Sequence, residues 1–404
     1  MKLRDFTIEV RDRALDRVGL IRPEDLSFEA QVSVNNVGTW TLTLPSEHPL
    51  ADTLRTPGSG LVITGPGDVL MSGPTTSYEY AATPEDRRGS LVVNGVSDSV
   101  ILSDMLAWPQ PSNANVTTQA TGHDERTGAA ETLMHAYVSA NCGPTAPPAR
   151  RRARLVMGAD LGRGPILAKA ARFPALGELL TEIATVAGLC FRIVQRGRQL
   201  VFETHAVTDR TKEIRLDVLA GTLAGQRVAV SAPAATRVLV AGQGEMEDRT
   251  FVPVENAESL AAESAWGRRI ERFVDQRQTD DADELAQAGA EVLADEGFTS
   301  TSVQAVPVAD SSMELGVDWG PGDRVTVIAA GREFTAPVTG LVIKASNEGF
   351  QAGALLGDPS AFDPTAAAAK AAQSAESRVS ALERTAEGGG TDPDGQVMHL
   401  MGAW

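Results

Sequence analysis

The sequence predicts an α+β fold dominated by β-strands, and three observations support this. Short apolar runs alternate with turn residues over residues 1–110, and a second set of such runs follows residue 226. Only a few segments carry the three- and four-residue apolar spacing of a helix. Hydrophobic residues make up 42% of the chain and charged residues 22%, the balance of a soluble globular protein. For this length of 404 residues we expect roughly two to four domains.

The first region, residues 1–110, has the strand pattern of a β-barrel or a β-sandwich. Turns at 35–38 and 65–68 are rich in Asn, Gly, Pro and Asp, so each is expected to join two strands as a hairpin. The predicted strands lie at 6–10, 26–34, 39–44, 61–64, 69–72 and 91–96.

An inserted α/β domain is predicted over residues 111–225. A helix is expected at 129–140, and residues 176–187 place their leucines on one helical face before Gly188 ends the helix. Two strands, at 189–194 and 200–203, follow as a hairpin around Gly197.

A second barrel-like domain with α+β character is predicted over residues 226–360. Its strands are expected at 227–230, 236–240, 303–308, 324–328 and 341–346. Residues 280–294 form an amphipathic helix whose positive end carries Asp280, Asp281 and Asp283. With Glu284 this acidic run resembles a calcium loop, but it lacks the turn-making Gly and the terminal Glu, so helix capping is the preferred interpretation.

Residues 361–404 are predicted to form a coiled-coil helix and a tail. Asp363 and Pro364 favour a helix start, and Gly388 favours its end. Between them, alternating steps of three and four residues place seven positions on one oligomer seam: Thr365, Ala368, Ala372, Ala375, Val379, Leu382 and Ala386. Because Ala buries little apolar surface, the seam is expected to continue an oligomer that the body has formed. A solvated, Ala-rich linker helix is the alternative.

The charge balance disfavours nucleic-acid binding. Acidic residues outnumber basic ones, 53 against 36, and the formal charge is −17. The basic cluster Arg150, Arg151, Arg152 and Arg154 is interpreted as a solvated loop rather than a phosphate site. No apolar run approaches the roughly 20 residues of a membrane helix, and the charged N-terminal residues do not resemble a signal peptide, so we expect synthesis in the cytoplasm of a host cell.

Catalytic and metal-binding motifs are not evident in the sequence. The best local candidate is His123, Asp124 and Glu125, with His135 twelve residues further on. Adjacent residues on a loop rarely converge on one ion, so a solvated turn is preferred there. Cys142 and Cys190 are expected to be reduced thiols. The sequence therefore predicts no catalytic residue, no metal site and no cofactor.

Several motifs together carry a resemblance to a known family. They are NVGTW at 36–40, LTLP at 42–45, MSGP at 71–74, NGVSD at 94–98, WGRRIERFVDQR at 266–277 and GPGDRV at 320–325. In this order they resemble minor tail proteins of actinobacterial siphophages, the tail-hub or baseplate hub-like family. The resemblance extends from about residue 6 to residue 382.

The resemblance implies a ring-forming hub at the distal tail tip of a virion. Such a hub is a homotrimer in which each chain has two barrel-like β domains with α/β insertions. It surrounds the DNA channel and links the distal tail protein and tail tube to fibres, a spike or other minor tail proteins. Two similar units in each of three chains would match a sixfold tube. No hydrolase or fibre domain follows the predicted helix, so those tasks are expected of other chains. The alternative is a cell-wall-degrading or carbohydrate-binding tail component.

Overall fold

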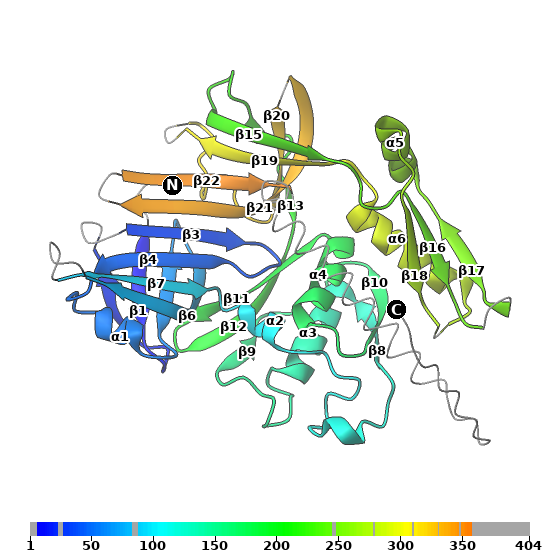
Figure 1. Ribbon diagram of the computed structural model, residues 1–404, viewed down its shortest axis with the longest axis horizontal. Coiled ribbons are helices and arrows are strands. Elements are labelled where there is room, and N and C mark those ends of the chain that lie inside the picture. The colour runs from blue at the N-terminus through cyan, green and yellow to red at the C-terminus, as the bar shows by residue number, and fades with distance from the viewer. Residues whose placement is uncertain are drawn as a thin grey trace, which may run out of the picture. The chain divides into compact units, whose positions relative to one another are not determined.

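Strands dominate the chain in the computed structural model, which confirms the predicted β-rich fold class (Figure 1). The structure describes residues 6–22, 27–82, 88–244, 248–277, 279–308, 311–329, 331–346 and 349–357. These residues belong to one compact unit. The predicted oligomer seam, including Ala368, Ala372, Ala375, Val379 and Leu382, lies outside the described residues.

The largest sheet runs through eleven strands and is curled as a half-barrel (Figure 1). Its order is β15 (Leu223–Ser231), β19 (Ser300–Pro307), β22 (Gly349–Leu356), β21 (Arg332–Ser346), β3 (Ser27–Ser33), β4 (Thr39–Pro45), β7 (Ser90–Val96), β6 (Val69–Ala81), β5 (Gly60–Thr64), β1 (Thr7–Arg11) and β2 (Arg17–Ile21). Three further strands branch from it: β20 (Asp323–Ala329) pairs with β21, β13 (Thr208–Asp209) and β14 (Arg215–Leu216). The short helix α1 (Ala51–Arg55) packs against β1 and β7.

The two strand-rich regions of the sequence meet in this one sheet. β21 pairs antiparallel with β3, from Gly340 opposite Ser33 to Ala345 opposite Phe28. Their buried side chains form a single hydrophobic core, which contains both Trp40 and Trp319. The ladder and the core are therefore continuous across the junction, while the domain boundaries at 110, 225 and 360 stay predictions.

The inserted α/β part lies between β7 and β13. It contains α2 (Val100–Asp104), the 3-10 helix η3 (Val116–Thr118), β8 (Asp124–Ala129), α3 (Ala130–Asn141), β9 (Leu155–Met157), β10 (Ile166–Ala171), α4 (Leu176–Ala187), β11 (Leu189–Arg196) and β12 (Gln199–Ala206). β10 pairs with β8, and β11, β12 and β9 form a second small sheet. Gly188 ends α4 in the left-handed conformation, with φ of 61°, as predicted. These elements enclose their own hydrophobic core.

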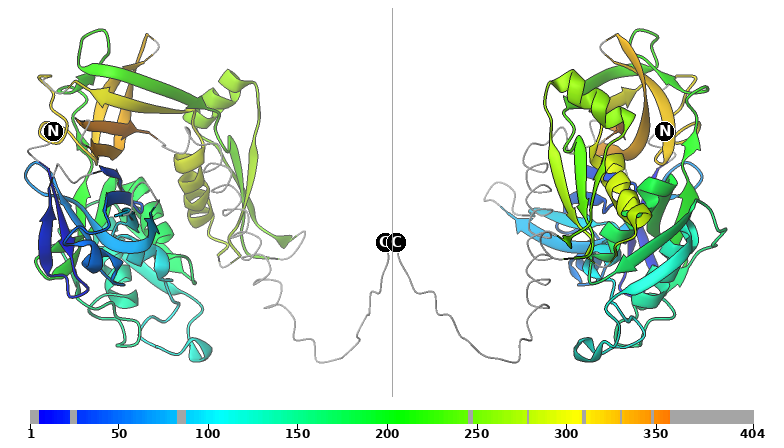
Figure 2. Two further views of the ribbon diagram at one scale, coloured as in Figure 1. Left: turned by 60° about the vertical axis from the view of Figure 1, so that its left-hand side comes forward. Right: turned by 90° about the vertical axis from the view of Figure 1, so that its right-hand side faces the viewer.

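A second insertion lies between β15 and β19. It contains β16 (Arg237–Ala241), β17 (Phe251–Val254), α5 (Ala257–Trp266), β18 (Glu271–Asp275) and α6 (Ala282–Glu296). α6 packs on one face of the three-stranded sheet, where Leu285 and Leu293 meet the valines of β16 (Figure 2, yellow-green). The Asp281 carboxylate accepts hydrogen bonds from the backbone of Asp283 and Glu284, which confirms the predicted helix cap. No helix in the described ranges has the length and hydropathy that a membrane crossing requires.

A buried ion pair fastens the first β region to the inserted α/β part. The Arg11 guanidinium on β1 contacts both carboxylate oxygens of Asp98, at 2.8 and 2.6 Å, and both side chains are 3% exposed. Ser72 of β6 donates to Asp98 at 2.6 Å, and the backbone of Gln195 on β11 donates to Ser72 at 2.7 Å. Arg11 also donates to the Gln195 side chain at 3.1 Å. Four segments that are distant in the sequence therefore share one hydrogen-bonded network.

A second, more exposed network holds the predicted 65–68 hairpin against β11 and β12. Arg192 and Arg196 of β11 both pair with Asp68 and with Glu203 of β12. The hydrogen bond from Arg196 is the largest cause that keeps the pKa of Asp68 well below its ordinary value. Asp68 of this hairpin thus has a structural role in joining two parts of the chain.

Candidate functional site

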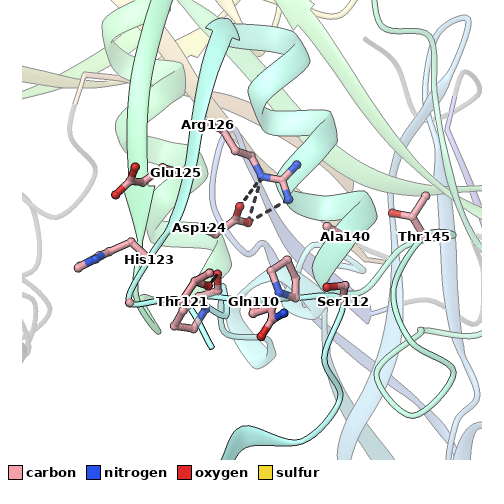
Figure 3. Close-up of a pocket in the computed structure, with 12 residues that line it drawn as sticks. Gln110, Ser112, Thr121, His123, Asp124, Glu125, Arg126, Ala140 and Thr145 are labelled. Carbon is pink, nitrogen blue, oxygen red and sulfur yellow. Dashed lines mark hydrogen bonds and ion pairs between the residues drawn. The ribbon is translucent and has the colours of Figure 1, made fainter. Parts of the chain in front are cut away.

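A polar pocket surrounds the histidine and carboxylates that the sequence singles out (Figure 3). Its volume is about 840 Å³. The lining residues come from the loop before η3, from the start of β8 and from the end of α3: Pro109, Gln110, Pro111, Ser112, Thr121, Gly122, His123, Asp124, Glu125, Arg126, Ala140 and Thr145. Most of the lining side chains are polar, and none of the lining residues is Phe, Tyr or Trp.

The Asp124 carboxylate forms an ion pair with Arg126. The Arg126 guanidinium donates to both of its oxygens at 3.0 Å, and the same guanidinium lies 5.0 Å from the Tyr137 ring centre. The Tyr137 hydroxyl is within hydrogen-bonding distance of the Asp124 and Lys169 carbonyl oxygens, at 3.0 and 2.9 Å, one on each strand of the β8–β10 pair. Asp124 therefore fixes the start of β8 and is a poor candidate for proton transfer.

His123 and Glu125 point away from Asp124 (Figure 3). Asp124 and Glu125 begin β8, whose side chains alternate between faces, so the predicted solvated turn is wrong for these two residues. The backbone ladder with β10 makes the strand despite a polar local sequence. Burial, together with the Arg172 charge, lowers the pKa of His123, which favours a neutral ring. The three side chains do not converge on one point.

His135 belongs to a different network, inside the α/β core. Its Nε2 atom lies 3.0 Å from the Thr204 hydroxyl, which donates at 2.7 Å to the fully buried Glu131 carboxylate. Arg163 binds the same carboxylate, and this hydrogen bond is the main reason that the pKa of Glu131 falls to about 2. His135 thus anchors α3 to β12 and does not join His123.

Other candidate groups also have structural partners. Burial raises the pKa of the Cys142 and Cys190 thiols to about 12, so neither is a ready nucleophile. The Arg150 guanidinium stacks 4.0 Å from the Trp108 ring centre, and Arg152 lies 3.6 Å from Asp104. Within the described ranges, no three His, Cys, Asp or Glu side chains are grouped as metal ligands would be. The arrangement offers no assembled catalytic site.

The large sheet contains a duplicated strand arrangement, which is the structural feature most relevant to function. We define the first unit as β3, β4, β6 and β7, and the second unit as β15, β19, β21 and β22. In both units the sheet order is first, second, fourth and third strand in chain order. In both, the long third strand pairs by its first half with an additional strand, β5 for β6 and β20 for β21. The same strand arrangement therefore occurs twice in one chain.

Matching irregularities confirm that the two units correspond. Each long strand carries a β-bulge at a threonine, Thr76 in β6 and Thr339 in β21. The Thr76 hydroxyl donates to the Asn94 carbonyl at 3.2 Å. The Thr339 hydroxyl lies 3.2 Å from the Leu355 carbonyl and 2.6 Å from the Gly357 carbonyl. Asn94 and Leu355 are each paired with the position after the bulge. The two bulges therefore occupy the same place in the two units, and each threonine hydroxyl lies near the equivalent carbonyl.

The turns before β5 and β20 match as well. Gly58 and Gly322 each follow a proline and adopt positive φ, 89° and 92°. Pro74 then pairs with Gly60, the first residue of β5, and Pro337 pairs with Arg324, the second residue of β20. The sequence pattern predicts two barrel-like domains but does not locate this repeated strand order. The paired Pro-Gly turns and the Pro-x-Thr segments are the signal that would have located it.

A family model matches residues 7–358 of the chain, and its description is Siphovirus ReqiPepy6 Gp37-like protein. The chain belongs to this family. The predicted resemblance to siphophage tail proteins is thereby confirmed, whereas the actinobacterial origin stays a prediction. The family match therefore gives similarity to a siphovirus protein, and the fold is compared with solved structures below.

Solved phage tail proteins share the fold at low sequence identity. The 43 kDa tail protein of prophage MuSo2 from Shewanella oneidensis is 12% identical, with a TM-score of 0.55, and the match covers 88% of this chain and 100% of that one. A tail protein from Neisseria meningitidis MC58 is 13% identical, with a TM-score of 0.52 and coverage of 89% and 99%. The prophage tail protein gp18 from Listeria monocytogenes EGD-e is 11% identical, with a TM-score of 0.50 and coverage of 87% and 94%. No curated protein sequence gives a match.

Proposed function

We propose that this ReqiPepy6 Gp37-like protein is the hub of the distal tail tip and assembles as a ring of three copies. The observation that carries the proposal is the duplication: two units of the same strand order are joined edge to edge by the β21–β3 ladder. Three copies supply six such units, which matches the sixfold arrangement of a tail tube. The protein thus adapts a threefold assembly to a sixfold one.

The face of the sheet opposite the core is the proposed wall of the DNA channel. Paired positions on this face carry mainly uncharged polar side chains that are partly buried: Gln31, Thr41, Thr43, Asn94 and Gln304. Glu29 and Lys344 lie on it as a pair at 2.9 Å, so their charges compensate. Phosphates gain little from such a wall, and DNA is expected to pass without sticking.

In this proposal the hub contacts the distal tail protein and the tail tube on one side and fibres, a spike or other minor tail proteins on the other. The seam at Ala368, Ala372, Ala375, Val379 and Leu382 would gather the three chains on the axis and control the opening of the channel. The ring provides most of the assembly energy, because alanines bury little surface.

The test is the mass of the full chain in solution, alone and with tail-tube protein, combined with electron microscopy. We expect threefold rings. The seam is tested by Val379→Asp with Leu382→Asp, which should weaken the trimer without abolishing it, and Ser380→Asp is the control off the seam. A chain that stays monomeric with tube protein present would refute the hub.

A role in cell-wall degradation or carbohydrate binding receives no specific support. His123 and Glu125 point away from Asp124, and no Phe, Tyr or Trp lines the pocket to stack on a sugar (Figure 3). The hub is therefore proposed to act by assembly and not by catalysis.

A further inference from the structure

The junction between the two units defines a contact that the chain makes only once. Inside the chain, β21 is the third strand of the second unit and pairs with β3, the first strand of the first unit. The corresponding contact would join β6, the third strand of the first unit, to β15, the first strand of the second. Among the described residues these two strands lie at opposite ends of the eight-stranded run, so the contact is not made (Figure 1).

Side-chain exposure at both ends fits a missing neighbour. Tyr78 and Tyr80 of β6 are each 52% exposed, although they pair with Val93 and Leu91, which are fully buried in the core. At the other end, Val230 of β15 is 56% exposed. Apolar and aromatic side chains on the core face of a sheet are normally covered, so each end lacks a covering strand among the residues that the structure describes.

We propose that β6 of one copy pairs antiparallel with β15 of the next copy, and that this ladder closes the ring. The inference rests on the proposed hub function and names the surface through which the copies join. The occupant is a second copy because the chain already makes the equivalent contact with itself, through β21 and β3. Two copies joined in this way continue the same sheet.

The register of the proposed β6–β15 ladder follows from comparing equivalent rows of paired residues in the two units. In the first unit, Ser77, Asn94, Thr41 and Glu29 form one cross-strand row, which begins directly after the Thr76 bulge. In the second unit, the row directly after the Thr339 bulge is Gly340, Leu355, Gln304 and Arg227. Glu29 therefore corresponds to Arg227.

Inside the chain, Glu29 pairs with Lys344, which is four residues beyond Gly340. The same step from Ser77 leads to Ala81, so Ala81 lies opposite Arg227 of the next copy. Counting back along the antiparallel ladder places Tyr80 opposite Val228 and Tyr78 opposite Val230. The most exposed core-face side chains of the two ends thereby meet, in aromatic and β-branched pairs that stabilise sheets.

Charges on the opposite face agree with this register. Glu79 lies two positions before Ala81 and so is the diagonal neighbour of Arg227 in the next copy. Long side chains reach across such a diagonal, and opposite charges there are favourable. Within the chain, the corresponding row carries the Glu29–Lys344 pair at 2.9 Å. A slip of one residue would place Tyr78 and Tyr80 on the opposite face from Val228 and Val230.

The experiment is disulfide cross-linking of the full chain carrying Tyr78→Cys and Val230→Cys. In the proposed register the two Cβ atoms lie about 5 Å apart, and oxidation should give covalent dimers and trimers on a non-reducing gel. The matched control is Tyr80→Cys with Val230→Cys, a diagonal about 7–8 Å apart that should cross-link far less. The native thiols of Cys142 and Cys190 are buried and should not contribute.

The outcomes separate this inference from the hub function. Efficient cross-linking of the first pair and little of the second supports the ladder and its register. Rings of three copies without that cross-link overturn the ladder and leave the hub standing, whereas monomers overturn both.

A second pair of variants covers the case in which the cysteines prevent folding. Glu79→Arg or Arg227→Glu alone should weaken assembly by up to about fivefold at each interface, and the two together should restore it. No rescue by the double variant overturns the register.

Discussion

The buried pair of Arg11 and Asp98 gives the sharpest stability prediction. Asp98→Asn keeps the shape of the side chain but removes its charge, so the Arg11 guanidinium, with a side chain 3% exposed, loses its counter-charge. Breaking a buried pair from one side typically costs about 3–5 kcal/mol. We expect the free energy of unfolding to fall by that amount, because the buried Arg11 charge is left unpaired and Ser72, which also binds the Gln195 backbone, donates to the same carboxylate.

Urea unfolding followed by tryptophan fluorescence measures this loss. The matched control is Glu9→Gln on the same strand as Arg11, since Glu9 pairs with Arg17 at the surface, with side chains 25% and 36% exposed. An exposed pair contributes at most about 1 kcal/mol. The double variant Arg11→Met with Asp98→Leu should cost less than Asp98→Asn, because it leaves no unpaired charge. Equal losses for Asp98→Asn and Glu9→Gln would refute the reasoning.

Three further predictions concern pH, backbone and thiols. The pKa of Glu131 is about 2 in the folded protein and about 4.3 in the unfolded chain, so the ionised carboxylate stabilises the fold above about pH 4.3 and this stabilisation is lost as the pH falls towards 2. Glu131→Gln should flatten the dependence of stability on pH in this range, as acid titration monitored by circular dichroism would show. Gly58→Ala and Gly322→Ala should each lower the melting temperature, since both positions have positive φ, and Gly322→Ala more, because its Cβ would lie 2.7 Å from the His205 ring; equal shifts would contradict this. Cys142 and Cys190 should react with a thiol reagent at pH 8 only after unfolding, because burial raises both pKa values to about 12; rapid labelling of the native chain would contradict this.

Much of the strand pattern was predictable because alternation of apolar residues reflects burial on one face. β4 is an example: Trp40, Leu42 and Leu44 are buried, and the threonines between them are not. β22 escaped prediction because its sequence GFQAGALL has glycines and alanines and no β-branched residue. It is a strand because β21 and β19 supply hydrogen bonds from both sides.

The candidate residues show a similar division. The caps of α4 and α6 were predictable, since Gly188 and Asp281 act on backbone groups within the same turn. The partner of His135 was not, because Thr204 lies 69 residues from His135 in the chain and no local pattern indicates that contact. The duplication was also hidden, since the second insertion separates β15 from β19, whereas the corresponding strands β3 and β4 are joined by a short turn.

The eight strands from β15 to β6 end in two strands that can each pair with another copy, and this determines when the assembly of copies stops growing. Units that join head to tail either close on themselves or extend as an open filament, and the curvature contributed by each unit decides between the two. If β6 and β15 join as proposed, closure pairs the second half of every β6 with a β15, and a completed collar has no such edge left for a fourth copy. Mutations that flatten the sheet would then be expected to yield fibres rather than smaller assemblies.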